Sequence, residues 1–151
     1  MGSVSIPVRL TLPESSAVAL TRAADEMADA CDNQRFLAAL DGNHRLWRAL
    51  NEIAHAKGWR IPDRRIADYV MSTTHKAGRA TSDDQIETLI AINRDMAAQL
   101  AGGQDLELVQ RRAELAWRER GRPYGVRLDH WLIAEMERKA RLRHVFNGHP
   151  A

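Results

Sequence analysis

The chain has 151 residues, of which 44% are hydrophobic and 28% are charged, so it is long enough for one globular domain or a small domain with an appendage. Its formal net charge of +2 is too small to indicate a nucleic-acid partner by itself. One cysteine, Cys31, excludes an internal disulfide bond, no apolar run approaches the ~20 residues that span a bilayer, and no signal-peptide pattern is present, so we expect a cytoplasmic protein without a membrane partner.

The N-terminal residues 3–12 alternate strictly between apolar positions and positions that are polar or proline. A period of two is typical of an extended strand with one apolar face. Because Pro7 lacks a backbone donor, the pattern predicts an edge strand or an extended arm over residues 1–13. No second strand is indicated elsewhere, so a homodimer that pairs this strand between two chains is an assembly that the sequence leaves open.

Four helices are predicted over residues 14–103, each from apolar residues at helical spacing. They cover residues 14–31, about 33–55, about 64–77 and about 83–100. Gly58 is expected to end the second helix, Ser82 and Gln85 have the spacing of a capping box, and Gly102 follows the fourth helix. Cys31 falls on the apolar side of the first helix, which predicts a buried and unreactive thiol.

A further pair of helices is predicted over residues 104–151, separated by the turn sequence "GRPYG". We therefore expect an all-α protein: a bundle of about four helices over 14–103 with a C-terminal helical hairpin over 104–151. Residues 105–151 hold 10 Lys and Arg against 7 Asp and Glu, a net charge of +3, while residues 1–104 hold 12 against 13. The basic run at 138–144 is either a solvated helix end or a contact for an anionic partner.

Sequence motifs of catalysis and of metal or cofactor binding are not found. The chain has no HExxH, paired CxxC, Walker loop or GxGxxG motif. His44 and His55 are eleven residues apart, which places them on one helix face, but no third ligand is nearby. No nucleophile, base and oxyanion site come together in the sequence. We expect a protein that is not an enzyme and that has no metal or cofactor.

A succession of motifs runs through residues 37–101: "ALDGNHRLW", "IPD", "YVMSTTHKA" and "DDQIETLIAINRDMAAQL". In this order and with similar gaps, they resemble the FlaF family of flagellar biosynthesis regulators. The matching residues are Ala39, Leu40, Asn43, Leu46, Trp47, Pro62, Tyr69, Val70, Thr73, Leu89, Ile90, Asn93, Arg94, Met96 and Leu100. The resemblance implies a cytoplasmic, chaperone-like helical adaptor that binds flagellin and supports its synthesis or export, alongside a second flagellar regulator.

The segment 111–137 is similar to a short bacterial helical family of unknown function. The residues that carry this similarity are Ala113, Trp117, Gly121, Arg122, Pro123, Gly125, His130, Trp131, Leu132, Ala134 and Glu135. This similarity implies no activity. From the residues themselves, Trp117 and Trp131 are expected to pack across the hairpin, Pro123 to lie in its turn, and His130 to bond back to that turn.

Asn43 and Asn93 are polar residues on the apolar sides of two predicted helices. A buried amide without a partner costs about 1–3 kcal/mol, so each is expected to be hydrogen-bonded. Our hypothesis is that Asn43 with Trp47 faces Asn93 with Arg94 and sets the register of the two helices, and that Gly42 lets their backbones approach closely. The alternative is that both asparagines point to solvent.

Two functional classes follow. In the first, the bundle has an apolar groove that captures an amphipathic flagellin segment as an added helix, with Trp59 as an interface anchor or as a lid over the bundle end. The groove candidates are Leu46, Trp47, Trp59, Tyr69, Leu89 and Ile92. The second is a nucleic-acid-binding module that uses the basic hairpin, although acidic residues are interleaved with the basic ones. Its candidates are Arg138, Lys139, Arg141 and Arg143.

Overall fold

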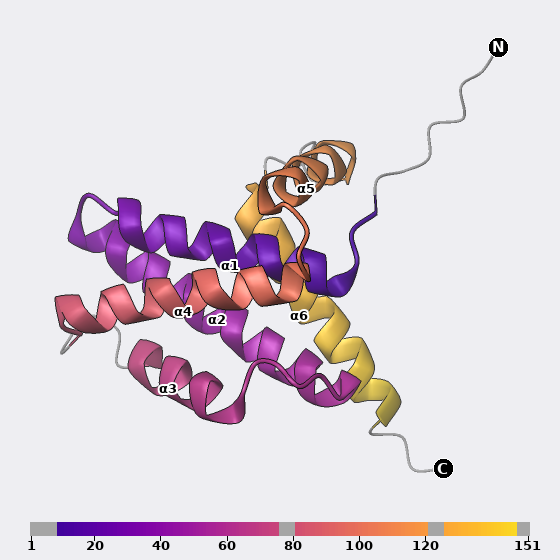
Figure 1. Cartoon of the computed structure of the whole chain (residues 1–151), viewed down its shortest axis with the longest axis horizontal. Coiled ribbons are helices and arrows are strands. Elements are labelled where there is room, and N and C mark those ends of the chain that lie inside the picture. Colours follow the sequence, from indigo (N-terminus) through magenta and orange to yellow (C-terminus); the bar gives the residue numbers. More distant parts are fainter. Residues whose placement is uncertain (1–8, 76–80, 121–125, 148–151) are drawn as a thin grey trace.

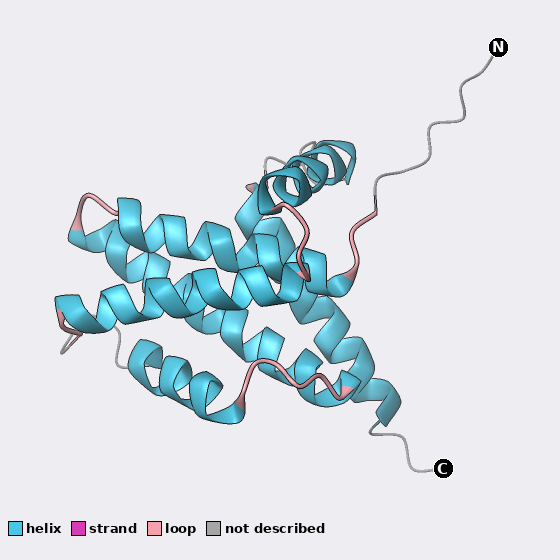
Figure 2. Cartoon of the chain, in the orientation of Figure 1, coloured by secondary structure: helices cyan, strands magenta, loops and turns pink. Residues whose placement is uncertain are grey.

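The structure is a computed structural model that describes residues 9–75, 81–120 and 126–147. These residues form six helices and no strand (Figures 1 and 2), which confirms the predicted all-α class. The helices are α1 (Leu12–Asp29), α2 (Asn33–Lys57), α3 (Arg64–His75), α4 (Asp83–Ala101), α5 (Leu106–Arg120) and α6 (Leu128–Asn147).

The predicted N-terminal arm or strand over residues 1–13 is not supported, because α1 already begins at Leu12. The backbone N–H of Thr11 donates to Glu14 Oε1 at 2.8 Å, and the N–H of Glu14 donates to Thr11 Oγ1 at 3.3 Å. This capping box satisfies two free donors of the first turn, and Pro13 fits there because that turn needs no donor from it. Residues 9–11 form no strand, and residues 1–8 lie outside the described part of the chain.

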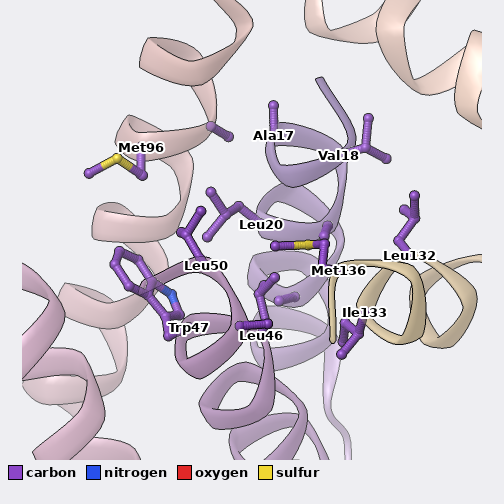
Figure 3. Packing of buried hydrophobic residues seen from close by; sticks show 14 of the residues in the cluster. Ala17, Val18, Leu20, Leu46, Trp47, Leu50, Met96, Leu132, Ile133 and Met136 are labelled. Carbon is purple, nitrogen blue, oxygen red and sulfur yellow. The ribbon is translucent and has the colours of Figure 1, made fainter. Parts of the chain in front are cut away.

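One hydrophobic core contains side chains from all six helices, so the bundle includes α5 and α6 and is larger than the four-helix unit that was predicted. Figure 1 shows α4 lying along α1, while α2 packs against α3 on one side and α6 on another. Figure 3 shows Leu20 of α1 and Leu46 of α2 in the same cluster as Met96 of α4 and Met136 of α6. The C-terminal helices therefore complete the core of the protein.

The predicted helix ends at Gly58, Ser82 and Gly102 are confirmed. Gly58 has φ 67° and Gly102 has φ 63°, a left-handed conformation in which glycine is the least strained residue. The N–H of Ser82 donates to Gln85 Oε1 at 2.9 Å, and the N–H of Gln85 donates back to Ser82 Oγ at 3.2 Å. The prediction for Cys31 is wrong: α1 ends at Asp29, so the thiol is exposed in the link before α2.

A buried carboxylate joins α5 to the start of α1. Glu14 is 5% exposed and accepts from the Arg112 guanidinium at 2.7 Å, while the same guanidinium donates to the carbonyl of Arg9 at 2.9 Å. Burial by itself raises the pKa of Glu14, but the hydrogen bonds from the Thr11 N–H and from Arg112 outweigh it and lower this pKa to about 2. The carboxylate therefore stays charged and holds the two helices together.

Candidate functional site

A buried polar cluster of Asn43, Trp47 and Asn93 lies at the centre of the bundle. Asn93 Nδ2 donates to Asn43 Oδ1 at 2.7 Å and to the Leu20 carbonyl at 3.2 Å, and Trp47 Nε1 donates to Asn93 Oδ1 at 2.9 Å. Both asparagines are 0% exposed, so the alternative that they point to solvent is wrong. The side chains face each other as expected, and Asn93 also ties α4 to α1.

The two neighbours assigned to this cluster lie elsewhere. Arg94 is exposed and forms an ion pair with Asp25 of α1 at 3.1 Å. A Cβ at Gly42 would meet no atom within 4 Å, so the prediction that Gly42 permits a close approach of two backbones is wrong. The space beside Gly42 is part of a cavity described below.

The orientation of each amide follows from the chemistry of its partner. The indole nitrogen of Trp47 can only donate, so the atom of Asn93 that it meets is the oxygen. Asn93 must then present its nitrogen to Asn43, which accepts through its own oxygen. Asn43 Nδ2 is left as a buried donor without a hydrogen-bond partner among the described residues.

A second polar contact links α2 to α3. The ring nitrogen Nδ1 of His44 lies 2.9 Å from Thr74 Oγ1, and this hydroxyl donates to the Val70 carbonyl at 2.6 Å. Thr74 is buried, whereas the resemblance was assigned to Thr73, which is only partly buried. In α3, the buried threonine is therefore Thr74, one position after the Thr73 that matched the FlaF motif. No group of three or more His, Cys, Asp or Glu in the described part of the chain is arranged to hold a metal.

The predicted apolar groove is not formed as expected. Leu46, Trp47 and Leu89 are 0% exposed and belong to the core, so they cannot meet a partner on this surface. Leu46 is enclosed in the hydrophobic core, which includes side chains of α6. The indole N–H of Trp47 donates its hydrogen bond to Asn93. Single-helix periodicity could not reveal this burial, because it arises from helices far apart in the chain.

The three remaining groove candidates are partly buried at the surface: Trp59 in the loop after α2, Tyr69 on α3 and Ile92 on α4. Ile92 lines a shallow depression on the outer side of α4. The other residues that line it are Asp84, Glu87, Thr88, Ala91 and Asp95. We call this depression the α4 face; three of its six residues are acidic.

In the C-terminal hairpin, Trp117 Nε1 donates to the Val126 carbonyl and so joins α5 to the residues before α6. Trp117 and Trp131 both pack against the core from its edge, and their contact with each other stays a prediction. Pro123 lies outside the described residues, as does the turn to which His130 was expected to bond. His130 itself is exposed in the first turn of α6.

The basic candidates of α6 are mixed with acidic partners. Arg138 forms an ion pair with Glu135 at 2.6 Å, and Lys139 is exposed. Arg141 lines a depression between α2 and α6 together with Glu52, Glu137, Arg45 and Arg48. Glu137 contacts Arg45 at 2.7 Å and raises the pKa of that guanidinium. The side chain of Arg143 lies outside the described residues.

A family model described as "Flagellar protein FlaF" matches residues 10–100. The chain belongs to the FlaF family. The match starts at residue 10, before the resemblance noted from about residue 37, and it therefore includes α1 as well as α2, α3 and nearly all of α4. Helices α5 and α6 follow the matched region. No curated protein and no solved structure matches the chain.

Membership of this family of flagellar proteins gives the protein a flagellar role. The Asn43, Trp47 and Asn93 cluster lies wholly within the matched region, and its three residues come from two motifs of the FlaF resemblance. Within the described residues, no helix has the length and apolar character needed to cross a membrane.

Proposed function

We propose that the protein is a flagellar adaptor that binds flagellin and, in a chaperone-like manner, supports its synthesis or export. The observation that carries this proposal is the FlaF match, which covers the α1–α4 unit and its buried Asn43–Asn93 contact. Asn43 and Asn93 are buried, so they stabilise the bundle, and the residues that recognise flagellin must lie on the surface.

The α4 face is the surface that best supports the proposal. Ile92 offers partly exposed apolar area there, and Asp84, Glu87 and Asp95 surround it with negative charge. An amphipathic segment could place its apolar side over Ile92 and its basic residues beside these acids. Trp59 provides a second apolar contact at the end of α2, as an anchor for the same or another part of the partner.

The alternative function is a nucleic-acid-binding module built on the basic residues of α6. The Arg138–Glu135 and Arg45–Glu137 pairs weaken its support, because paired carboxylates reduce the positive potential that phosphates would meet. Phosphate contacts make binding fall steeply as salt rises. A filter-binding titration with RNA and duplex DNA at two salt concentrations separates this function from the flagellar one.

The test of the proposed function uses the full chain and unassembled flagellin from the same organism in size-exclusion chromatography with light scattering. We expect a stable complex, and isothermal titration should give an affinity that Ile92→Arg weakens at least about tenfold, equal to 1.4 kcal/mol. Ala134→Arg is the matched control, because Ala134 is exposed on α6 and does not line the α4 face. Both variants should retain the helical circular dichroism of the parent.

Trp59→Ala should also weaken the complex while the fold is kept, if Trp59 is an anchor. The proposed function would be overturned if no complex forms with flagellin that is unassembled and still able to polymerise. A complex that Ile92→Arg and Ala134→Arg affect equally would remove the α4 face from the proposal and leave flagellin binding intact.

A further inference from the structure

A cavity of about 180 Å³ lies between α1, α2 and the first turns of α6. Its walls include the small residues Ala23 of α1 and Ala39 and Gly42 of α2, with Ile133 of α6. The volume is close to that of cavities of about 150 Å³ that hold a benzene-sized molecule. It can therefore accept a group of about six non-hydrogen atoms.

Two buried polar side chains line this cavity and each has an atom without a partner among the described residues. One atom is Asn43 Nδ2, whose identity as a donor follows from the Trp47–Asn93–Asn43 hydrogen bonds. The other is Asp129 Oδ1, an acceptor on a residue that is 7% exposed. A buried polar atom left without a hydrogen-bond partner is unfavourable, so an occupant that hydrogen-bonds to both atoms gains binding free energy.

Charges at the rim select against an ionic occupant. Arg127 pairs with Glu26 and also with Asp129 Oδ2, at 3.3 Å in the second case. An anion would be repelled by the two carboxylates, and a cation would have to compete with Arg127 for them. The chemistry therefore favours a neutral group that accepts from Asn43 and donates to Asp129.

We infer that this cavity is a binding site for a primary carboxamide, either a small free amide or a glutamine or asparagine side chain. The carbonyl oxygen of the carboxamide accepts from Asn43 Nδ2, its nitrogen donates to Asp129 Oδ1, and its alkyl part packs on Ala23, Ala39 and Gly42. The site lies on α1, α2 and α6, away from the α4 face, and it does not depend on flagellin binding.

The test compares two ligands of nearly equal shape on the unaltered chain. Butyramide both accepts and donates, whereas 2-pentanone replaces the amide nitrogen with a methyl group and only accepts. In ¹⁵N–¹H NMR titrations, we expect butyramide to give saturable shifts at the Asn43 side-chain amide and the Gly42 N–H, and 2-pentanone to bind at least about tenfold more weakly. Absence of saturable shifts at these groups, or equal affinity for both ligands, would overturn the inference.

Variants test the location of the site. Gly42→Leu fills the space beside α2 and should abolish the butyramide shifts, while Ala98→Leu makes a similar enlargement at an exposed position of α4 and should leave them unchanged. Asp129→Ala should remove the preference for butyramide over 2-pentanone. Unchanged binding to a folded Gly42→Leu protein would place the amide elsewhere and refute the site, and the two-ligand comparison decides the matter if that variant fails to fold.

The two sources of a carboxamide are separated by adding unassembled flagellin to the butyramide complex. Displacement of butyramide supports a side chain of flagellin as the occupant. Formation of a flagellin complex without displacement supports a free amide instead. Failure of flagellin to bind at all, with butyramide binding retained, overturns the proposed function and leaves the carboxamide site standing.

Discussion

Replacement of Asn93 by leucine should destabilise the protein by about 3 kcal/mol. The substitution removes the partner of Trp47 Nε1 and of Asn43 Oδ1, for which the structure shows no other hydrogen bond within the described residues. Two orphaned buried groups cost about 2–6 kcal/mol together, and the added apolar surface of leucine offsets part of this cost. For a chain of this size, 3 kcal/mol corresponds to a fall in Tm of about 6–12 °C.

The assay is urea unfolding followed by circular dichroism and by tryptophan fluorescence. Asn51→Leu is the control, because Asn51 is exposed on α2 and its replacement should change the free energy of unfolding by no more than about 0.5 kcal/mol. The double variant Asn43→Leu with Asn93→Leu should cost about 1–2 kcal/mol less than the sum of the single changes, since both remove the same hydrogen bond. A loss below about 1 kcal/mol for Asn93→Leu, or full additivity, would refute the reasoning.

Three further predictions concern single residues. Gly42→Ala should raise the free energy of unfolding by about 1 kcal/mol in urea, because it improves helix propensity without a clash, and a loss of stability would contradict this. Since the folded pKa of Glu14 is about 2, below the usual 4.5, its stabilisation is present above pH 4.5 and is lost as pH falls through 2. Glu14→Gln should flatten this part of the pH–stability curve, and an unchanged slope would count against it. Cys31 should react with a thiol reagent in native protein, and reaction only after denaturant is added would show that it is shielded.

Several helix ends could be predicted because they depend on residues a few positions apart. The Ser82 and Gln85 side chains and the Gly58 and Gly102 backbones act within one turn, so their spacing alone indicates the outcome. The N-terminal alternation was outweighed by an equally local signal: Thr11 and Glu14 form a capping box that starts α1 within the predicted arm. Periodicity and capping compete there, and the hydrogen bonds of the cap decide the result.

The contact between Asn43 and Asn93 was also predictable in outline. Each residue lies on an apolar helix side, and the cost of burying an unpaired amide required a partner. The sequence could not identify the Leu20 carbonyl of α1 as a further acceptor in this cluster, because only the packing of α1 against α2 and α4 brings it to Asn93, 73 positions later in the chain. For the same reason, the motif that contains Asn43 did not indicate that its side-chain nitrogen Nδ2 would be buried without a hydrogen-bond partner among the described residues.

By itself, the sequence determined the all-α class, most helix boundaries and membership of the FlaF family, because each of these depends on local patterns or on a succession of motifs. Tertiary structure decided which apolar residues are accessible. Leu46, Trp47 and Leu89 had the pattern expected of a binding groove, yet packing of all six helices into one core encloses them. The tertiary structure also placed Asp129 in the wall of the cavity that Asn43 lines, although the two residues are 86 positions apart in the chain. Burial and long-range proximity are properties of the packed helices together, so no pattern within one helix could predict them.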